Sequence, residues 1–403
     1  MAAILSFNSF AFFYLLWVLL VWARRVLWMT QFQKLNPPLK AVEASDPSVN
    51  EPAGGGSVSG GKVSVIIPAR NEEKNIARCL FHLSKQNYSN FEIITVDDRS
   101  DDRTGHLIDN FKTMSQAPFK TVRIEKLPPG WTGKNHAMFA GSKAASGDWL
   151  LFTDADTSHK PASIRTAVTC AVQNKIDLLT LAPETECRTF WEKTVQPLAV
   201  SGLALWFNAP VLNDPASKTV LANGQYILIK KKIYEAVGGN ESVKSEVVED
   251  VELAKKVRAA GHTVKFLNGT DLYSTRMYSS LKEIKTGWTR IYTYLFNKNI
   301  FSILHKIFLF VCFSIFPFVL LGLEKFWWFS GSARFDGQVF IAASLACLLI
   351  LAVRFFGNRL LKCDPWYALL HPLGSLVMVW ILLSCLGRVI FNRPSIWRGD
   401  SYR

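Results

Sequence analysis

VSVIIPARNEE at residues 63–73 combines a run of apolar residues, typical of a buried strand, with a polar turn directly after it. Two later stretches have the same form and end in acidic residues, ITVDDRSDD at 94–102 and LLFTDADT at 150–157. Ligands of an open α/β sheet bind beyond the carboxyl ends of its strands. We therefore expect these three polar ends to meet in one crevice.

The carboxylates in these stretches predict the kind of ligand. Asp97 and Asp98 end one expected strand, and Asp154 and Asp156 follow the next. On an extended strand end, alternate residues point to the same side, so the last two carboxylates would face together. Crowded carboxylates repel one another unless a positive charge lies among them. A hard divalent cation, Mg²⁺ or Mn²⁺, that carries a phosphorylated substrate fits this pattern.

The composition indicates a soluble domain joined to membrane segments. Of 403 residues, 49% are hydrophobic and 19% are charged, which is too apolar for an ordinary soluble protein and too charged for a membrane bundle alone. The formal net charge is +14, and basic residues cluster beside apolar runs, as at Arg24 and Arg25. This placement favours contact with membrane lipids over nucleic acid. The seven cysteines are scattered, which argues for reduced thiols and a cytoplasmic catalytic domain.

Four apolar segments are long enough to cross a cell or inner membrane. The first, 4–22, is expected to be an uncleaved anchor within 1–25, and a flexible linker follows at 41–62. The other three are expected within 300–390, before a basic tail at 391–403, and are residues 303–323, 336–355 and 367–387. Four crossings would place the tail outside, whereas the positive-inside rule would keep it inside, so its orientation stays open.

Between the apolar segments, residues 63–299 alternate between strand and helix patterns, which predicts an α/β domain with a mostly parallel sheet. Its strands are expected at 63–67, 92–96, 121–125, 149–153, 177–181, 225–230 and 263–267. Its helices are expected at 73–86, 101–112, 134–146, 161–174, 232–237 and 249–260. The apolar run 198–210 is too short to span a bilayer and predicts either an interfacial segment or a buried core helix.

Together the motifs resemble a known family. VSVIIPARNEE, VDD, DAD and VVEDVELAKKVRAAG are similar to motifs of the glycosyltransferase family 2 enzymes of GT-A fold. LPPGWTGKNHA at 127–137, NDP at 213–215 and GWTR at 287–290 resemble the membrane-bound branch of hopanoid-associated, carotenoid (diaponeurosporenoate-type) and, more distantly, ceramide glycosyltransferases. The resemblance implies a Rossmann-like GT-A domain. It also implies inverting, metal-dependent transfer of a hexose from a nucleotide diphosphate-sugar, a UDP-sugar above all, to a hydroxyl of a lipid acceptor.

The resemblance also implies a donor site. In the family, the first βα turn cradles the nucleobase and ribose, and here that turn consists of Pro68, Ala69, Arg70, Asn71 and Glu72. A carboxylate at the end of the second strand binds the uracil N–H, a role for Asp98 or Asp97. Asp156 corresponds to the direct metal ligand, with Asp154 beside it. From the residues alone, Asn71 could instead cap a helix.

Three further features complete the expected site. Lys134 follows Gly133 at the start of an expected helix, where an ammonium and free N–H groups suit a phosphate, although a surface lysine is the alternative. Inverting transfer needs a general base, and by resemblance Asp250 is that base, with Glu249 beside it. The alternative is an acid that the helix dipole favours. The family has a glycine-rich acceptor-side strand where this chain has Gly224, Gln225 and Tyr226.

KTGWTRI at 285–291 departs from the Q/R-x-x-R-W motif of processive relatives, which predicts a non-processive enzyme. Trp288 and Arg290 either serve the acceptor and the diphosphate or belong to an interfacial amphipathic helix over 279–299. His159 is expected at the surface, at a helix start.

Two competing functions remain from the sequence. A polyprenyl phosphate acceptor would need less help from a base, and a catalytically silent membrane scaffold would keep the fold without turnover. The sequence does not identify the sugar, the lipid acceptor or the oligomeric state.

Overall fold

A computed structural model describes residues 2–42, 60–207, 209–397 and 400–402. The chain divides into two compact units, each discontinuous in sequence. The helical unit comprises Met1–Leu35, Cys187–Trp206 and Tyr278–Arg393, and the sheet unit comprises Asn36–Glu186, Phe207–Met277 and Pro394–Arg403. The expected domain 63–299 is therefore shared between the two units. Most of the expected linker, residues 43–59, lies outside the described residues.

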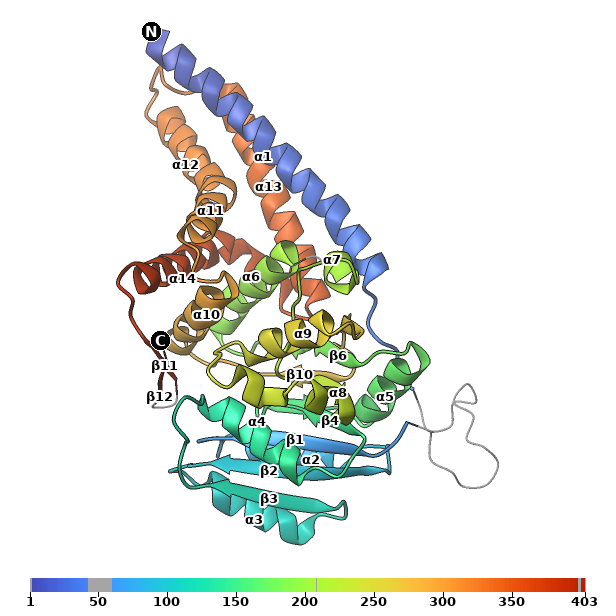
Figure 1. Ribbon diagram of the computed structural model, residues 1–403. Helices are drawn as coiled ribbons and strands as arrows, with labels where there is room; N and C mark the ends of the chain where they lie inside the picture. Colours follow the sequence, from blue (N-terminus) through green and yellow to red (C-terminus); the bar gives the residue numbers. More distant parts are fainter. Residues whose placement is uncertain (1, 43–59, 208, 398–399, 403) are drawn as a thin grey trace. The chain divides into compact units, whose positions relative to one another are not determined.

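The main sheet of the sheet unit has the strand order β3-β2-β1-β4-β8-β6-β9. The strands are β1 (Val63–Ala69), β2 (Phe91–Asp98), β3 (Phe119–Ile124), β4 (Trp149–Phe152), β6 (Leu178–Ala182), β8 (Ile227–Lys230) and β9 (Val264–Asn268). Only β8 runs antiparallel to its neighbours, and the pairs β1–β2, β2–β3, β1–β4 and β6–β9 are parallel. The chain runs outward from β1 to β3 and returns on the other side of β1 as β4 (Figure 1). The strand order thus reverses between β1 and β4, which is where open α/β sheets bind ligands.

Alternation along the strands explains how the sheet is covered on both faces. Val63, Val65 and Ile67 of β1 point into one core, whereas Ile66 points into the other. The first core also contains residues of α2 (Ile76–Leu83), α3 (Thr104–Met114) and α5 (Ser163–Gln173). The second contains residues of α4 (Gly133–Ala144), α8 (Lys231–Ala236) and α9 (Glu249–Ala259). Because both faces are buried, the strands read as continuous apolar runs.

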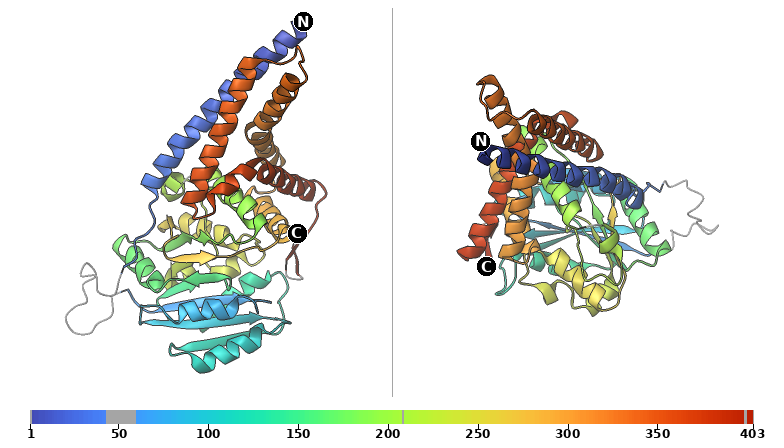
Figure 2. Two further views of the ribbon diagram at one scale, coloured as in Figure 1. Left: turned by 180° about the vertical axis from the view of Figure 1, so that it is seen from behind. Right: turned by 90° about the horizontal axis from the view of Figure 1, so that it is seen from above.

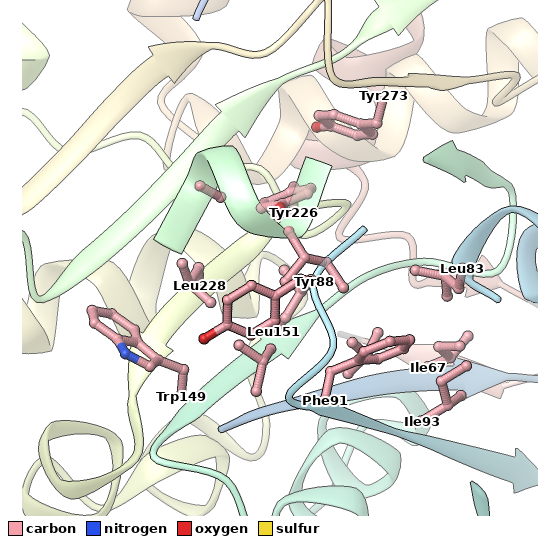
Figure 3. Close-up of a cluster of buried hydrophobic side chains, with 14 of the residues drawn as sticks. Ile67, Leu83, Tyr88, Phe91, Ile93, Trp149, Leu151, Tyr226, Leu228 and Tyr273 are labelled. Atoms are coloured by element: carbon pink, nitrogen blue, oxygen red, sulfur yellow. The ribbon is translucent and has the colours of Figure 1, made fainter. Parts of the chain in front are cut away.

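Figure 3 shows the first of these cores, in which aromatic side chains from separate elements gather beneath the sheet. Tyr226 and Tyr273 lie with ring centroids 5.1 Å apart, and both rings are fully buried. This packing joins the main sheet to a second, three-stranded sheet in the order β5-β10-β7. Its strands are β5 (Thr157–His159), β7 (Glu184–Thr185) and β10 (Tyr273–Thr275). The sequence does not predict this second sheet, because segments so short carry no periodic signal.

The helical unit contains the apolar helices. They are α1 (Ala2–Leu35), α6 (Phe190–Trp206), α10 (Leu281–Leu295), α11 (Ile300–Phe310), α12 (Phe316–Phe329), α13 (Gly337–Leu360) and α14 (His371–Ile390). Within the described residues, four helical segments are long and apolar enough to cross a membrane, namely Phe7–Leu35, Ile300–Phe329, Gly337–Leu360 and Pro365–Ile390. This confirms one such segment near the N-terminus and three towards the C-terminus. Helix α1 packs along α13 (Figure 2).

The apolar run 198–210 divides at the end of α6. Its first part, up to Trp206, is helical and packs with α10 and α14 in one buried cluster. Val195, Leu198 and Ala199 of α6 are buried in that cluster. This part of the run is therefore a buried core helix of the helical unit, the second of the two structures that the sequence leaves open.

Four further short elements belong to the sheet unit. Helix α7 (Ala209–Asn213) packs against β9, and a 3₁₀ turn, η1 (Gly239–Val243), packs against α4 and α9. The tail forms an antiparallel pair of strands, β11 (Ser395–Trp397) and β12 (Asp400–Tyr402).

Candidate active site

The loop after β1 is fastened to the loop after β2 on one side of the switch point. Asn71 has a φ of 54°, in the left-handed region that Asn tolerates better than most residues. Its Oδ1 accepts the backbone N–H of Asp101 at 2.9 Å, and its own N–H donates to Ser100 Oγ at 3.1 Å. Asn75, rather than Asn71, occupies the N-cap of α2. Asn71 therefore ties the two loops together instead of capping the helix.

The other residues expected at the nucleobase lie around the same two loops. Pro68 and Ala69 end β1, where Ala69 is in register with Asp97, and Arg70 follows them. Glu72 is buried, and its N–H donates to Thr104 Oγ1 at 2.7 Å. Pairing of neighbouring strands thus brings the ends of β1 and β2 to one edge of the sheet, as the sequence predicts.

Both carboxylates at the end of β2 are buried and hydrogen-bonded. Asp98 is 3% exposed and accepts Arg99 Nε at 2.8 Å, while Asp97 accepts the Ser100 N–H at 3.2 Å. Arg99 has a φ of 56°, so the backbone turns sharply directly after Asp98. Asp97 and Asp98 are held by this turn, which orients their carboxylates at the end of the strand.

Lys134 joins three elements of the site. It lies on the first turn of α4, and Thr132 caps this helix by accepting the Asn135 N–H. Its Nζ is 2.8 Å from Asp154 Oδ1 and 3.1 Å from Glu249 Oε1. Burial alone would lower the pKa of Lys134, but the carboxylates of Asp154, Glu249 and Asp250 outweigh burial and raise it. The ammonium is therefore charged and bridges β4 to α9.

The surroundings of Asp250 raise the pKa of its carboxyl group. Asp250 lies on the first turn of α9, and its Oδ2 accepts the Gly224 N–H at 2.7 Å. Burial, together with the neighbouring charge of Glu249, raises the pKa of Asp250 to about 7, although Lys134 acts in the opposite direction. A carboxylate with a pKa near neutrality can both accept and release a proton at physiological pH.

Gly224 leaves room for this cluster. A Cβ at this position would lie 2.9 Å from Lys134 Nζ and 3.3 Å from Asp250 Oδ2. A side chain at this position would displace the Lys134 ammonium and crowd the Asp250 carboxylate, so glycine lets both groups lie against the backbone. The sequence places Gly224 on the acceptor side by resemblance, but nothing in the sequence indicates its hydrogen bond to Asp250.

Asp154 and Asp156 follow β4 on either side of the buried Ala155. Asp156 Oδ1 accepts Thr275 Oγ1 at 3.4 Å, and Thr275 in turn accepts Gln225 Nε2 at 3.0 Å. Thr275 comes from β10, in the second sheet, so sequence spacing gave no indication of it. The hydrogen-bonded chain from Gln225 through Thr275 thus orients the Asp156 carboxylate.

The acidic pair can supply only part of a metal site. Within the described residues, no group of three or more His, Cys, Asp or Glu side chains could hold a metal ion. Asp154 is paired with Lys134, as described above. The donor set fits Mg²⁺ or Mn²⁺ bound by one or two carboxylates, with substrate phosphates and water as the remaining ligands.

His159 does not lie at the surface, so this expectation is wrong. It is 1% exposed, and its Nε2 is 2.9 Å from Thr153 Oγ1. Its ring stacks on Tyr273, with the centroids 5.7 Å apart. Burial lowers the pKa of His159 to about 3, so the imidazole is neutral. His159 lies on β5, and it packs beneath the Asp154–Asp156 loop as part of the core.

The tryptophan and arginine of KTGWTRI belong to the helical unit. Trp288 lies on α10, is 2% exposed, and its Nε1 donates to Gln196 Oε1 of α6. Arg290 lies on the same helix and is half-buried. The structure thus gathers Lys134, Asp154, Glu249 and Asp250 in the sheet unit, whereas Trp288 packs inside the helical unit. Trp131 of the sheet unit also packs, against His136 and Phe139.

Comparison with known proteins gives likenesses in sequence and in structure. The family model described as Glycosyl transferase family 2 matches residues 64–237. A 4,4'-diaponeurosporenoate glycosyltransferase of Staphylococcus haemolyticus is 28% identical over 231 residues, which are 57% of this chain and 60% of that protein. Its namesake in Staphylococcus aureus (strain USA300) is 25% identical over 234 residues, with the same two shares. The alignments thus span three fifths of these relatives' length.

Among solved structures, the mannosyltransferase PcManGT from Pyrobaculum calidifontis, in complex with GDP-Man and Mn²⁺, is similar over 97% of this chain and 99% of that one. The TM-score is 0.51 at 16% sequence identity, which shows a common fold. The mostly parallel sheet with its reversal between β1 and β4 is accordingly GT-A-like. Residues 64–237 of this chain therefore match a domain of the glycosyltransferase family 2 type.

Proposed function

We propose that this chain is a membrane-bound, inverting glycosyltransferase. It transfers a hexose from a nucleotide diphosphate-sugar, a UDP-sugar above all, to a hydroxyl of a lipid acceptor, and it does not polymerise. The observation that carries this proposal is Asp250, a half-buried carboxylate with a pKa of about 7 beside the Lys134–Asp154 ion pair. A scaffold without turnover would have no use for a carboxylate adjusted in this way.

The proposed reaction is a single displacement at the anomeric carbon. The acceptor hydroxyl attacks this carbon, and its proton passes to the Asp250 carboxylate. A new bond forms between the acceptor oxygen and the sugar, the bond to the diphosphate breaks, and its electron pair leaves with the nucleoside diphosphate. Two backbone N–H groups fix the orientation of the Asp250 carboxylate. The Gly224 N–H donates to Oδ2, and the Val251 N–H donates to Oδ1. General-base catalysis of this kind contributes roughly 10²- to 10⁴-fold in rate.

A divalent cation would be held by Asp156, with Asp154 beside it. When bound, Mg²⁺ or Mn²⁺ would neutralise the charge that develops on the leaving diphosphate. Lys134 adds a positive charge at the same place, because its Nζ lies 2.8 Å from Asp154 Oδ1. The common fold with a mannosyltransferase described in complex with GDP-Man and Mn²⁺ supports a test of both ligands.

Two observations support a lipid acceptor at a membrane. The chain has four helical segments able to cross a bilayer, within the residues described. Its curated relatives are named for a carotenoid-type acceptor, 4,4'-diaponeurosporenoate. We place the catalytic unit on the cytoplasmic face, where nucleotide sugars are made and cysteines stay reduced. None of the seven cysteines, all of which lie among the described residues, forms a disulfide.

Metal dependence tests the donor half of the proposal. Purified protein in detergent would be given a panel of UDP- and GDP-sugars with a total lipid extract, and nucleoside diphosphate release would be followed with and without EDTA. We expect release to require Mg²⁺ or Mn²⁺ and to fall by about 10²-fold or more in Asp156→Ala. Asp109→Ala, an exposed acid on α3 paired with Arg123, is the matched control. Release that survives both EDTA and Asp156→Ala would overturn the proposal.

A further inference from the structure

A second group of polar side chains is buried in the helical unit, apart from any residue used above. Arg354 on α13 is 5% exposed, and His371 and Ser375 on α14 are 1% and 0% exposed. His371 and Ser375 are four residues apart, so they lie on one face of α14. The charge of Arg354 acts on His371, which places the two side chains close together. We call these three residues the Arg354 cluster.

The polar atoms of the Arg354 cluster are not satisfied by the protein. Among the residues that the structure describes, Nε of Arg354, both ring nitrogens of His371 and Oγ of Ser375 are buried without a hydrogen-bond partner. Arg354 is anchored at one end, where Nη2 donates to the carbonyl of Thr194 on α6 at 3.1 Å. Buried polar groups are nearly always hydrogen-bonded in native proteins. Four such atoms in one place indicate a partner that is not part of the chain.

Within the part of the chain that the structure describes, no carboxylate acts on the charge of Arg354. The groups that act on its guanidinium are the thiols of Cys363 and Cys187. The hydrogen bond with Cys363, and burial, raise the pKa of Cys187, so this thiol stays neutral. A buried guanidinium without an anion is strongly destabilising, because desolvation is not compensated. The missing partner is therefore expected to be negatively charged.

The surroundings define the place of this partner. The rings of Trp22 on α1 and Phe318 on α12 lie 5.9 Å and 6.1 Å from the His371 ring. His371 is the first residue of α14, so the positive end of that helix points to the same place. Arg354 precedes the end of α13 by six residues, about 9 Å along the axis. This depth suits a lipid head group better than the middle of a bilayer.

We propose that the Arg354 cluster binds the phosphate or carboxylate oxyanion of an anionic lipid within the helical unit. Arg354 supplies charge-assisted hydrogen bonds, which suit an oxyanion in geometry and strength. His371 and Ser375 supply further donors from the adjacent helix. Trp22 and Phe318 provide apolar walls for the part of the lipid next to its head group.

Native mass spectrometry of the detergent-purified full chain tests this proposal. Samples would contain phosphatidic acid, a fatty acid, phosphatidylcholine or inorganic phosphate, and thermal unfolding would be measured in parallel. We expect wild type to retain one anionic lipid and to unfold at a higher temperature with it, whereas phosphatidylcholine has no such effect. If inorganic phosphate alone gives the same shift, the oxyanion site is confirmed and its source is free anion rather than lipid.

Arg354→Met and Arg359→Met form a matched pair on α13, because Arg359 is exposed. We expect Arg354→Met to bind anionic lipid about 10- to 100-fold more weakly, since it removes charge-assisted hydrogen bonds, and Arg359→Met to bind as wild type does. Without anionic lipid, Arg354→Met should unfold at the same or a higher temperature, because an uncompensated charge is gone. Should Arg354→Met not fold, Ser375→Ala, expected to weaken binding roughly fivefold, takes its place.

Three results would overturn the proposal. The first is a wild type whose unfolding and lipid retention do not respond to any anion. The second is an equal loss of lipid in Arg354→Met and Arg359→Met, which would show general surface attraction. The third is an Arg354→Met protein that is destabilised in neutral detergent and still retains the lipid. These experiments measure lipid binding and unfolding, not sugar transfer. A negative result would therefore overturn the lipid site without bearing on the proposed transferase activity.

Discussion

At the scale of single residues, the account depends on the protonation of Asp250. Its pKa is raised to about 7 by burial first and by Glu249 second. The carboxylate must be deprotonated to accept the acceptor proton, so activity should rise with pH through about 7. Because the folded pKa is raised from 3.8 to about 7, the contribution of Asp250 to stability is fully present below about pH 4 and is lost as the pH rises to about 7. The raised pKa that suits Asp250 to proton transfer therefore lowers the stability of the folded protein.

Asp250→Asn tests this role. The amide keeps the shape and cannot accept the proton, so we expect kcat to fall by roughly 10²- to 10⁴-fold while donor binding persists. The remaining rate should lose its dependence on pH near neutrality. Glu252→Gln, which removes an acid paired with Lys255 on the same helix, should leave the rate unchanged. An Asp250→Asn protein with most of its rate intact would favour a phosphate acceptor, which is already an anion.

Opposite shifts of the pH profile are expected from the two neighbours of Asp250. Lys134 lowers the pKa of Asp250 and Glu249 raises it. Lys134→Met should therefore move the rising limb of the pH–rate profile to higher pH, and Glu249→Gln should move it to lower pH, each by about one unit or more. Lys143→Met, an exposed lysine on the same helix as Lys134, is the control. Shifts in the same direction would show that these charges do not act through Asp250.

Much of the candidate site follows from the sequence at this scale, and its internal pairing does not. The sequence itself shows acidic residues at the ends of the expected strands. A parallel sheet brings these strand ends to one edge. The Lys134 contacts join residues far apart in the chain, Asp154 and Glu249, and depend on the docking of α9 against the sheet. The hydrogen bond from Thr275 to Asp156 depends on a strand of three residues. Neither contact leaves a periodic or motif signal.

At the scale of elements, apolar periodicity located the main-sheet strands and the helices on its faces within a few residues. The sequence was ambiguous for α6 and silent for the second sheet. His159 illustrates the reason. A histidine is polar, so the sequence predicts that it lies at the surface. In the structure β5 pairs with β10, and the imidazole is buried between Thr153 and Tyr273. Tertiary packing, rather than local preference, decides such positions.

Close packing of α14 against α6 can be tested with two glycines of one helix. A Cβ at Gly374 would lie 2.7 Å from the Thr194 carbonyl oxygen and 2.6 Å from Leu198 Cδ1, whereas at Gly387 it would meet nothing within 4 Å. Gly374→Ala should therefore destabilise the protein by about 1–3 kcal/mol. Gly387→Ala should stabilise it by roughly 0.5–1 kcal/mol through helix propensity. Thermal unfolding in detergent micelles measures both, and equal effects would refute the contact.

At the scale of the whole molecule, the formal net charge of +14 and the four apolar helical segments describe a protein suited to an anionic membrane surface. The sheet unit carries the acidic site, and the helical unit carries the apolar helices and the Arg354 cluster. Binding of donor and of anionic lipid are therefore assigned to different units of the same chain. This division is compatible with the proposed enzyme, whose donor is soluble in water.

The most direct test of the central claim is a single assay on the detergent-purified chain. Nucleotide sugars would be supplied one at a time, with Mg²⁺ or Mn²⁺ and a total lipid extract. Nucleoside diphosphate release and the mass of every lipid would be followed together. The account predicts release from one donor that requires both metal and lipid, together with one lipid that gains the mass of a hexose residue. Donor binding without release, whatever the lipid extract, would contradict it.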